Sequence, residues 1–169
     1  MATVLKVKNL KTHFKLRTGT LKAVDGLSFE VEPGRVLCIV GESGSGKSVT
    51  AQSIMRLIEQ PGRIVDGSIQ YRDQDLLTLS ENEVEKLRGN RIGMIFQDPM
   101  TSLNPVFTIG EQIAETIVAH QGVKKNEART RAVELLRLVG IPEPEGRLND
   151  YPHQFSGGMR QRVLIAIAI

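Results

Sequence analysis

The sequence predicts an α/β fold with an antiparallel β layer at its start and a helical region at its end. Three observations support this prediction. Residues 3–32 alternate apolar and polar side chains, as half-buried strands do. An apolar run at residues 35–40 predicts a buried strand, and residues 49–58 favour a helix shortly after it. From residue 108 onward, apolar residues recur at helical spacing.

The N-terminal layer is expected to consist of short strands joined by turns. Strands are predicted over residues 4–7, 13–16, 21–31 and 67–72. Turns are indicated at residues 18–20 and 33–34. Residues 91–96 predict a second buried strand, like the run at 35–40. The single cysteine, Cys38, lies in that earlier run, so we expect a small buried apolar residue and no disulfide framework.

Capping sequences mark the expected helix starts. Residues 80–83 and 108–111 have the Ser/Thr-x-x-Glu pattern of a capping box, in which two side chains bond reciprocally to backbone N–H groups. Asn126 is expected to cap a longer helix, because apolar residues at helical spacing follow it. We therefore predict a helical insert over residues 108–150.

Residues 41–48 contain the most informative pattern in the chain, G-x-x-x-x-G-K-[ST]. A glycine-rich loop that opens a helix directs several backbone N–H groups to one point, where the helix dipole adds about half a positive charge. Lys47 is expected to reach the β- and γ-phosphates of a nucleotide, and the Ser48 hydroxyl to hold Mg²⁺. The alternative is a flexible glycine- and serine-rich loop, but the predicted strand–loop–helix setting favours phosphate binding. The residues expected around the phosphates are Gly41, Glu42, Ser43, Gly44, Ser45, Gly46, Lys47 and Ser48.

A second glycine-rich helix start occurs much later in the chain. Ser156 precedes Gly157 and Gly158, and the residues after them favour a helix. A helix start with so few side chains can present its N–H groups to an anion. In the alternative interpretation, Ser156 is an ordinary N-cap and the glycines form a tight turn.

These motifs together resemble the ATP-binding-cassette (ABC) ATPases. Residues 41–48 match the Walker A loop of that family, and Gln97, in Ile-Phe-Gln-Asp-Pro, matches its Q-loop glutamine. Residues 155–159, Phe-Ser-Gly-Gly-Met, match the signature Leu-Ser-Gly-Gly-Gln except at its two ends. The resemblance covers the whole chain and implies a P-loop NTPase core of the ABC ATPase type. Residues 96–105 and 151–154 look like the oligopeptide, dipeptide and nickel branch of bacterial importers.

The resemblance also implies roles for individual residues. Phe14 falls where the family places an aromatic residue against adenine, although a phenylalanine in a β layer is usually a core residue. Gln97 would act in catalysis with Lys47 by positioning Mg²⁺ or the attacking water, unless it is only a polar residue that ends a strand. In a head-to-tail dimer, residues 156–158 of one subunit would contact the γ-phosphate bound by the other.

Partners and location follow from the same resemblance. The implied partners are a second ABC ATPase subunit, transmembrane permease subunits and, indirectly, a solute-binding protein, with ATP and Mg²⁺ as cofactors at the cytoplasmic face of the membrane. Residues 98–118, including Glu111 and Glu115, would form the groove for a cytoplasmic helix of the permease. The predicted division is a β layer with Walker A core and Q-loop at 1–107, and a helical subdomain with the signature at 108–169.

Composition does not favour a nucleic-acid-binding protein. The net charge is only +3, and Lys and Arg are interleaved with Asp and Glu along the chain. Aromatic residues make up 4% of the sequence and tryptophan is absent, which leaves few side chains for base stacking.

Hydrolysis of ATP needs further groups that this sequence lacks. In ABC ATPases an aspartate and a glutamate end the strand after the signature helix, and a histidine lies on the next strand. The chain stops at Ile169, and no run of four apolar residues followed by Asp-Glu occurs in it. We therefore expect a fragment in which the C-terminal part of the core is missing and the apolar residues 163–169 are exposed.

Two alternatives to the transporter subunit are considered. One is a truncated ATP-binding module without hydrolytic activity. The other is a different P-loop enzyme, such as a GTPase or a small-molecule kinase. The sequence disfavours a GTPase because it lacks the guanine-reading pattern Asn-Lys-x-Asp, and a kinase would not need residues 156–158.

Overall fold

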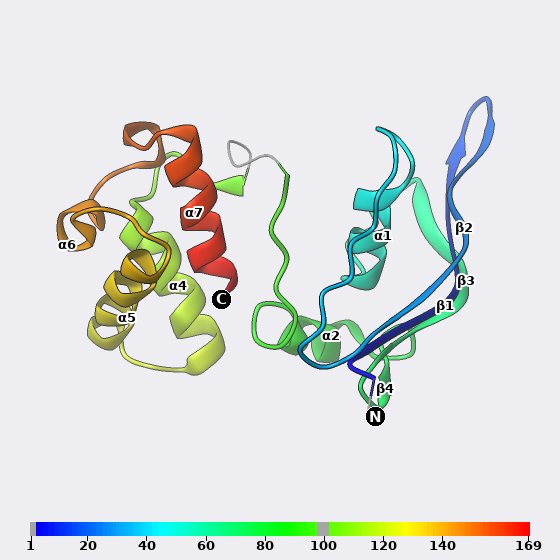
Figure 1. The fold of residues 1–169 in the computed structure, drawn as a ribbon, viewed down its shortest axis with the longest axis horizontal. Coiled ribbons are helices and arrows are strands. Elements are labelled where there is room, and N and C mark those ends of the chain that lie inside the picture. Colours follow the sequence, from blue (N-terminus) through cyan, green and yellow to red (C-terminus); the bar gives the residue numbers. More distant parts are fainter. Residues whose placement is uncertain (1–2, 98–101) are drawn as a thin grey trace. The chain divides into compact units, whose positions relative to one another are not determined.

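The computed structural model of the chain describes residues 3–97 and 102–169 (Figure 1). It contains two compact units, Met1–Glu85 and Lys86–Ile169, which are described separately. The first unit is built mainly of strands and the second mainly of helices. These units do not test the predicted division after residue 107, which remains a prediction.

A four-stranded antiparallel sheet forms the frame of the first unit. Its strands are β1 (Leu5–Leu16), β2 (Gly19–Val31), β3 (Gly62–Tyr71) and β4 (Gln74–Asp75), in the order β2-β1-β3-β4. Strands β1 and β2 form a long hairpin in which Leu16 pairs with Gly19. The sheet confirms the predicted antiparallel layer, although β1 joins two predicted short strands into one and β3 begins earlier than predicted.

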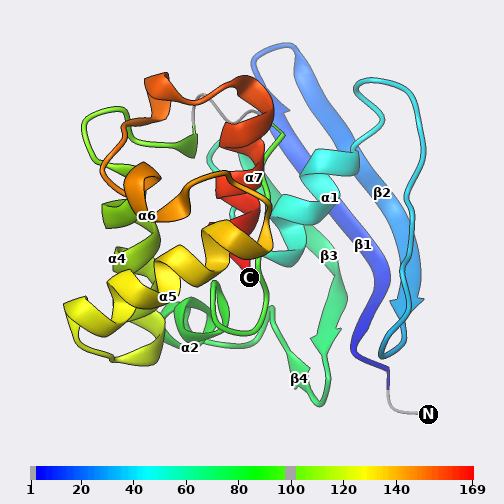
Figure 2. The same ribbon diagram turned by 60° about the vertical axis from the view of Figure 1, so that its left-hand side comes forward.

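Helix α1 (Lys47–Ile54) packs on one face of this sheet (Figure 2). The buried hydroxyls of Thr12 on β1 and Ser53 on α1 hydrogen-bond to each other at 2.7 Å. The helix ends earlier than predicted, because Arg56 has a left-handed φ of 53° that cannot continue a right-handed helix. The buried apolar side chains of the unit are Val7, Leu10, Val24, Met55, Ile69, Leu76 and Val84.

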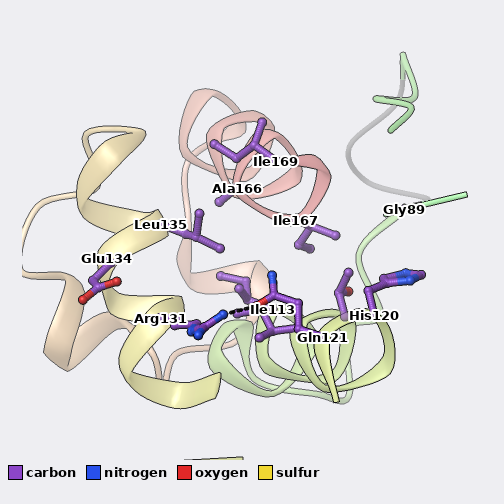
Figure 3. Close-up of a pocket in the computed structure, with 12 residues that line it drawn as sticks. Gly89, Ile113, His120, Gln121, Arg131, Glu134, Leu135, Ala166, Ile167 and Ile169 are labelled. Atoms are coloured by element: carbon purple, nitrogen blue, oxygen red, sulfur yellow. Dashed lines mark hydrogen bonds between the residues drawn. The ribbon is translucent and has the colours of Figure 1, made fainter. Parts of the chain in front are cut away.

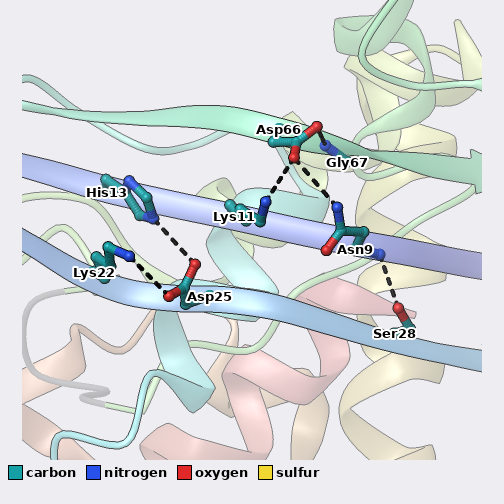
Figure 4. Close-up of polar contacts among 8 residues, drawn as sticks. All are labelled: Asn9, Lys11, His13, Lys22, Asp25, Ser28, Asp66 and Gly67. Atoms are coloured by element: carbon teal, nitrogen blue, oxygen red, sulfur yellow. Dashed lines mark hydrogen bonds and ion pairs between the residues drawn. The ribbon is translucent and has the colours of Figure 1, made fainter.

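Polar contacts stabilise the irregular centre of the sheet, where β1 shifts register against both neighbours (Figure 4). Asn9 has a left-handed φ of 47°, and its backbone N–H donates to Ser28 Oγ at 2.8 Å. Asn9 Nδ2 and Lys11 Nζ both donate to Asp66 Oδ2, at 3.2 and 2.8 Å. The bond from Lys11, and then that from the backbone N–H of Gly67, hold the pKa of Asp66 below its ordinary value.

The second unit has its own apolar core between helices. Its elements are α4 (Ile109–Gln121), α5 (Lys125–Leu138), α6 (Pro144–Arg147), the 3₁₀ turn η1 (Pro152–Gln154) and α7 (Gly157–Ala168). The short helix α2 (Glu81–Leu87) spans the division between the units. Fully buried core residues include Ile109, Ile113, Leu136 and Val163. The structure therefore confirms the helical insert predicted over residues 108–150.

Both predicted capping boxes form, but the predicted cap of α5 is wrong. The carboxylate of Glu83 accepts from the N–H and the hydroxyl of Ser80, at 2.8 and 2.6 Å. Thr108 and Glu111 bond reciprocally at the start of α4. At α5 the N-cap is Lys124, not Asn126, and no described side chain caps this helix. An extended backbone at Lys124 starts the helix two positions earlier, so Asn126 lies inside the first turn.

Helix α7 corrects the expectation of an exposed apolar end. Val163, Leu164 and Ala166 are buried, because α7 packs into the core that α4 and α5 also line. Ile169 is 65% exposed, as predicted. Among the described residues, no helix combines the length and the apolar character needed to cross a bilayer.

Two predicted buried strands do not form. Residues 35–40 have no regular secondary structure and are all exposed, so Cys38 is exposed as well. Residues 91–96 make only an isolated bridge, between Ile92 and Arg88. An apolar run becomes a strand only when a neighbouring strand satisfies its backbone N–H and C=O groups. No segment within the described residues pairs with either run as a strand, so the predictions fail for lack of a partner.

Candidate functional site

The loop at residues 41–48 connects the exposed segment 35–40 to α1. Gly44 and Gly46 have φ angles of 81° and 90°, which residues with a side chain rarely adopt. Space is also missing at Gly46, because a Cβ there would lie 2.2 Å from the carbonyl oxygen of Ala23 on β2. Gly46 therefore lets the loop touch the sheet at a distance that a side chain would prevent.

The ammonium group of Lys47 is held by the loop itself. Its Nζ donates to the carbonyl oxygens of Gly41 and Glu42, at 2.8 and 2.6 Å, and to Ser45 Oγ at 3.2 Å. Gly41 also needs to lack a side chain, because a Cβ there would lie 2.5 Å from Ser45 Oγ. The loop thus surrounds a positive charge of fixed position.

The start of α1 is open to a ligand. Gly46 occupies the N-cap position, and no side chain in the described part of the chain caps this helix. The N–H groups of a helix's first turn have no intrahelical acceptor, and they carry the positive end of the dipole. Ser48 in this turn is exposed, so its hydroxyl is available to a cation beside a phosphate. Together with Lys47, this helix start has the chemistry of a polyphosphate site.

Phe14 lies on β1 directly opposite Gly62 of β3. Residues two apart on a strand share a face, so Phe14 lies on the face of Thr12, which bonds to α1. The ring is half-buried. This position is compatible both with packing and with adenine stacking, and the role of Phe14 remains a prediction.

Ser156 begins α7, as predicted. Its Oγ accepts from the N–H of Met159 at 3.3 Å, and its carbonyl oxygen accepts from the N–H of Arg160 at 2.9 Å. Arg160 Nε donates to the carbonyl oxygen of Pro152 at 2.8 Å, which ties the preceding turn to the helix. Phe155 is only 2% exposed and anchors the same segment in the core.

The next two residues, Gly157 and Gly158, are exposed in the first turn of α7. Neither has a left-handed φ, and no atom of the described residues lies within 4 Å of a Cβ built on either one. The described fold would therefore accept a side chain at both positions. This contrasts with Gly46, which its own unit requires.

Gln97 is exposed at the end of an extended segment in the second unit. Residues 98–101, which follow it, lie outside the described residues. Gln97 and residues 156–158 belong to a different unit from the phosphate loop. Their predicted approach to Mg²⁺ and to the γ-phosphate therefore remains a prediction.

A groove of about 630 Å³ lies between α4 and α5. Glu111 and Glu115 of α4 line it, as do Lys125 and Arg129 of α5. The structure thus places both predicted acidic residues on one surface. The α5 wall was missed from the sequence, although two cations spaced four residues apart share one face of a helix. The apolar lining consists of Phe107, Ala114, Val118 and Ala119.

A second cavity, of about 430 Å³, is lined by residues of α4, α5 and α7 (Figure 3). Arg131 lines it, but its guanidinium group donates to Gln121 and to Glu127. Side chains such as Ile113 and Ile167 make other parts of the lining apolar. None of the residues predicted to bind nucleotide lines this cavity, so it is not the candidate site.

Known proteins share these motifs. A family model described as ABC transporter matches residues 24–169. The chain is 55% identical to the oligopeptide transport ATP-binding protein AppD of Bacillus subtilis, over 100% of this chain and 52% of that protein. It is 54% identical to the dipeptide transport ATP-binding protein DppD of Haemophilus influenzae, over 98% of this chain and 50% of the relative. The chain thus spans about half the length of the curated relatives it matches.

Solved structures support the same assignment. The dimeric ATP-binding cassette MJ0796 in a post-hydrolysis state with ADP and Pi matches with a TM-score of 0.86 and 29% identity. The match covers 98% of this chain and 68% of that one. A second dimeric structure of MJ0796, described as a bacterial ABC transporter cassette, gives a TM-score of 0.85. These matches confirm the predicted α/β fold of the ABC ATPase type. The family model and the identity to peptide-transport proteins show that this chain belongs to the ABC transporter family.

Proposed function

We propose that this chain is part of the ATP-binding subunit of an importer for peptides or a related small solute. In the complete dimer, the subunit would couple the hydrolysis of Mg-ATP to transport. The observation that carries the proposal is the loop at residues 41–48. It holds the ammonium group of Lys47 in a fixed position next to the uncapped start of α1. Free N–H groups and a fixed cation at one point suit the phosphates of a nucleotide.

Residues 156–158 support a paired arrangement. Gly157 and Gly158 are exposed, and the described fold needs neither of them for backbone conformation or for space. Small residues at such a helix start leave the N–H groups accessible to an anion from outside the unit. We therefore assign them to the γ-phosphate on a second ABC ATPase subunit, where Gln97 would position the attacking water or Mg²⁺.

The groove between α4 and α5 supports a membrane partner. It combines an apolar floor with the carboxylates of Glu111 and Glu115 on one wall and cations on the other. An amphipathic helix fits such a groove by burying its apolar face. We assign the groove to a cytoplasmic helix of the permease, which places the subunit at the cytoplasmic face of the membrane. The solute-binding protein would act indirectly, through the permease.

A titration of Mg-ATP into the 169-residue chain tests the phosphate site. Wild-type protein should bind, and Lys47→Ala should remove most of the binding because it removes the fixed cation. Lys125→Ala is the matched control, since this lysine lies in the groove on α5. Equal ATP affinity of wild type and Lys47→Ala would contradict the proposal.

The second candidate function is a nucleotide-binding module without turnover. It is favoured by one sequence observation, the lack of any Asp-Glu pair after four apolar residues. For this chain we expect no Mg-ATPase activity above background. Turnover by the repurified chain that disappears in Lys47→Ala would exclude this second candidate.

The groove assignment is tested in the complete transporter. Charge reversal at Glu111 or Glu115 should lower transport while leaving ATP binding unchanged. Reversal of Glu134, on the opposite side of the unit's core from neither nucleotide motif nor groove, serves as a control because it does not line the groove. Normal transport in both groove variants would contradict the assignment.

A further inference from the structure

The ring of Phe14 occupies the space that a side chain at Gly62 would need. These two residues pair directly across β1 and β3. A Cβ built on Gly62 would lie 2.5 Å from Cε1 and 2.8 Å from Cδ1 of Phe14. It would also lie 2.8 Å from Cγ2 of Ile58. Carbon atoms in contact prefer separations of about 3.5–4.0 Å, so the ring would have to move.

The backbone at Gly62 gives no other reason for a glycine. Its φ is outside the left-handed region, unlike that of Gly44 or Gly46. The neighbouring strand connection is also held in place, because the N–H of Gly62 donates to the carbonyl oxygen of Glu59 at 2.9 Å. The N–H of Lys15 donates to that of Pro61 at 3.2 Å. An added side chain would therefore displace the Phe14 ring more readily than the strand.

We infer that Gly62 and Ile58 are positioning residues that orient the Phe14 ring for stacking against the base of the bound nucleotide. This inference rests on the proposed function, which supplies the nucleotide. Gly62 removes the atoms that would push the ring away, and Ile58 closes the space beside it. A half-buried ring fixed on one edge loses less freedom when a base stacks on it than a freely rotating ring does.

A purely structural role makes a different prediction. Aromatic side chains that cover a glycine on a neighbouring strand also stabilise sheets. In that case Gly62→Ala would lower the stability of the protein and weaken all ligands of the loop equally. A positioning role acts on the base alone, because the phosphates bind at residues 41–48.

The test compares ATP with inorganic tripolyphosphate, which has the same phosphate chain but no base. Both are titrated, with Mg²⁺, into the 169-residue chain and its variants. Gly62→Ala should weaken ATP about fivefold to tenfold, the range expected from the partial loss of one base–aromatic stack. Tripolyphosphate affinity should stay unchanged. Gly146→Ala is the matched control, because a Cβ there meets no atom of the described residues within 4 Å.

Two further variants keep the result decisive if Gly62→Ala folds poorly. Ile58→Ala adds no atom and should also weaken ATP without affecting tripolyphosphate. In a Phe14→Ala background, Gly62→Ala should cause no further change in ATP affinity, because it acts through the ring. Each of these results would support the inference.

The opposite results separate the two levels of the proposal. If Gly62→Ala and Ile58→Ala bind ATP like wild type, or weaken both ligands equally, the positioning inference is overturned and the phosphate site stands. A further loss of ATP affinity from Gly62→Ala in the Phe14→Ala background also overturns it. If wild type fails to bind tripolyphosphate, the proposed function fails, and this inference fails with it.

Discussion

Replacement of Gly46 by alanine should disturb both the phosphate loop and the sheet beneath it. A left-handed φ of 90° costs a residue with a side chain about 1–2 kcal/mol. The added Cβ would also lie 2.2 Å from the carbonyl oxygen of Ala23, so the loop or β2 has to move. Forced backbone shifts of this kind typically cost about 1–3 kcal/mol. The two effects together predict a loss of about 2–5 kcal/mol in the free energy of unfolding.

Gly34 offers a matched control for this prediction. It also has a left-handed φ, of 69°, but a Cβ there meets no described atom within 4 Å. Gly34→Ala should therefore lose only the backbone cost of about 1–2 kcal/mol and should keep its ATP affinity. Urea unfolding and an ATP titration of both variants measure the difference. Equal losses of stability together with equal ATP affinities would refute the argument that contact with Ala23 shapes the loop.

Three further predictions concern stability. Thr108→Ala removes the cap of α4 and should lower the free energy of unfolding by about 1 kcal/mol in urea, with recovery in Thr108→Ser. Thr12→Val removes the buried bond to Ser53 and should cost about 1–3 kcal/mol in the same assay, whereas an unchanged midpoint would contradict the importance of that bond. The pKa of Asp66 is lowered in the folded state, chiefly by Lys11, so its stabilisation is present above the unfolded value near 3.8 and is lost as pH falls through the lower folded value. Asp66→Asn should remove this part of the acid-induced loss, and an identical pH profile of stability for the variant would contradict the assignment.

The elements predicted correctly are those whose signals are local. The capping boxes at Ser80 and Thr108 and the cap at Ser156 depend on groups within a few residues, so the sequence shows both partners. The hairpin of β1 and β2 follows from alternation and a turn. The runs at 35–40 and 91–96 were predicted wrongly because a strand also depends on a neighbour that may lie anywhere in the chain. Their apolar composition indicates a tendency to form strands and says nothing about pairing.

The candidate site divides in the same way. The phosphate loop could be identified because its eight positions are contiguous and each has a defined task. The groove was only half predicted, since its second wall comes from α5, and Lys125 attracts attention only once α4 and α5 are known to pack together. The contacts of Gly46 with Ala23 and of Gly62 with Phe14 join residues far apart in the sequence. A pattern of residue types cannot reveal such close approaches, because they depend on strand register.

The glycines of this chain therefore carry different kinds of information. Gly46 is required by its own unit, through both backbone angle and space. Gly62 is required by space alone, and the atoms that fill this space belong to a side chain with a predicted role in binding. Gly157 and Gly158 are required by neither within the described residues. A glycine that the fold does not need is best explained by something that approaches from outside it. For residues 156–158, the open helix start makes an anion on a second subunit the most economical candidate.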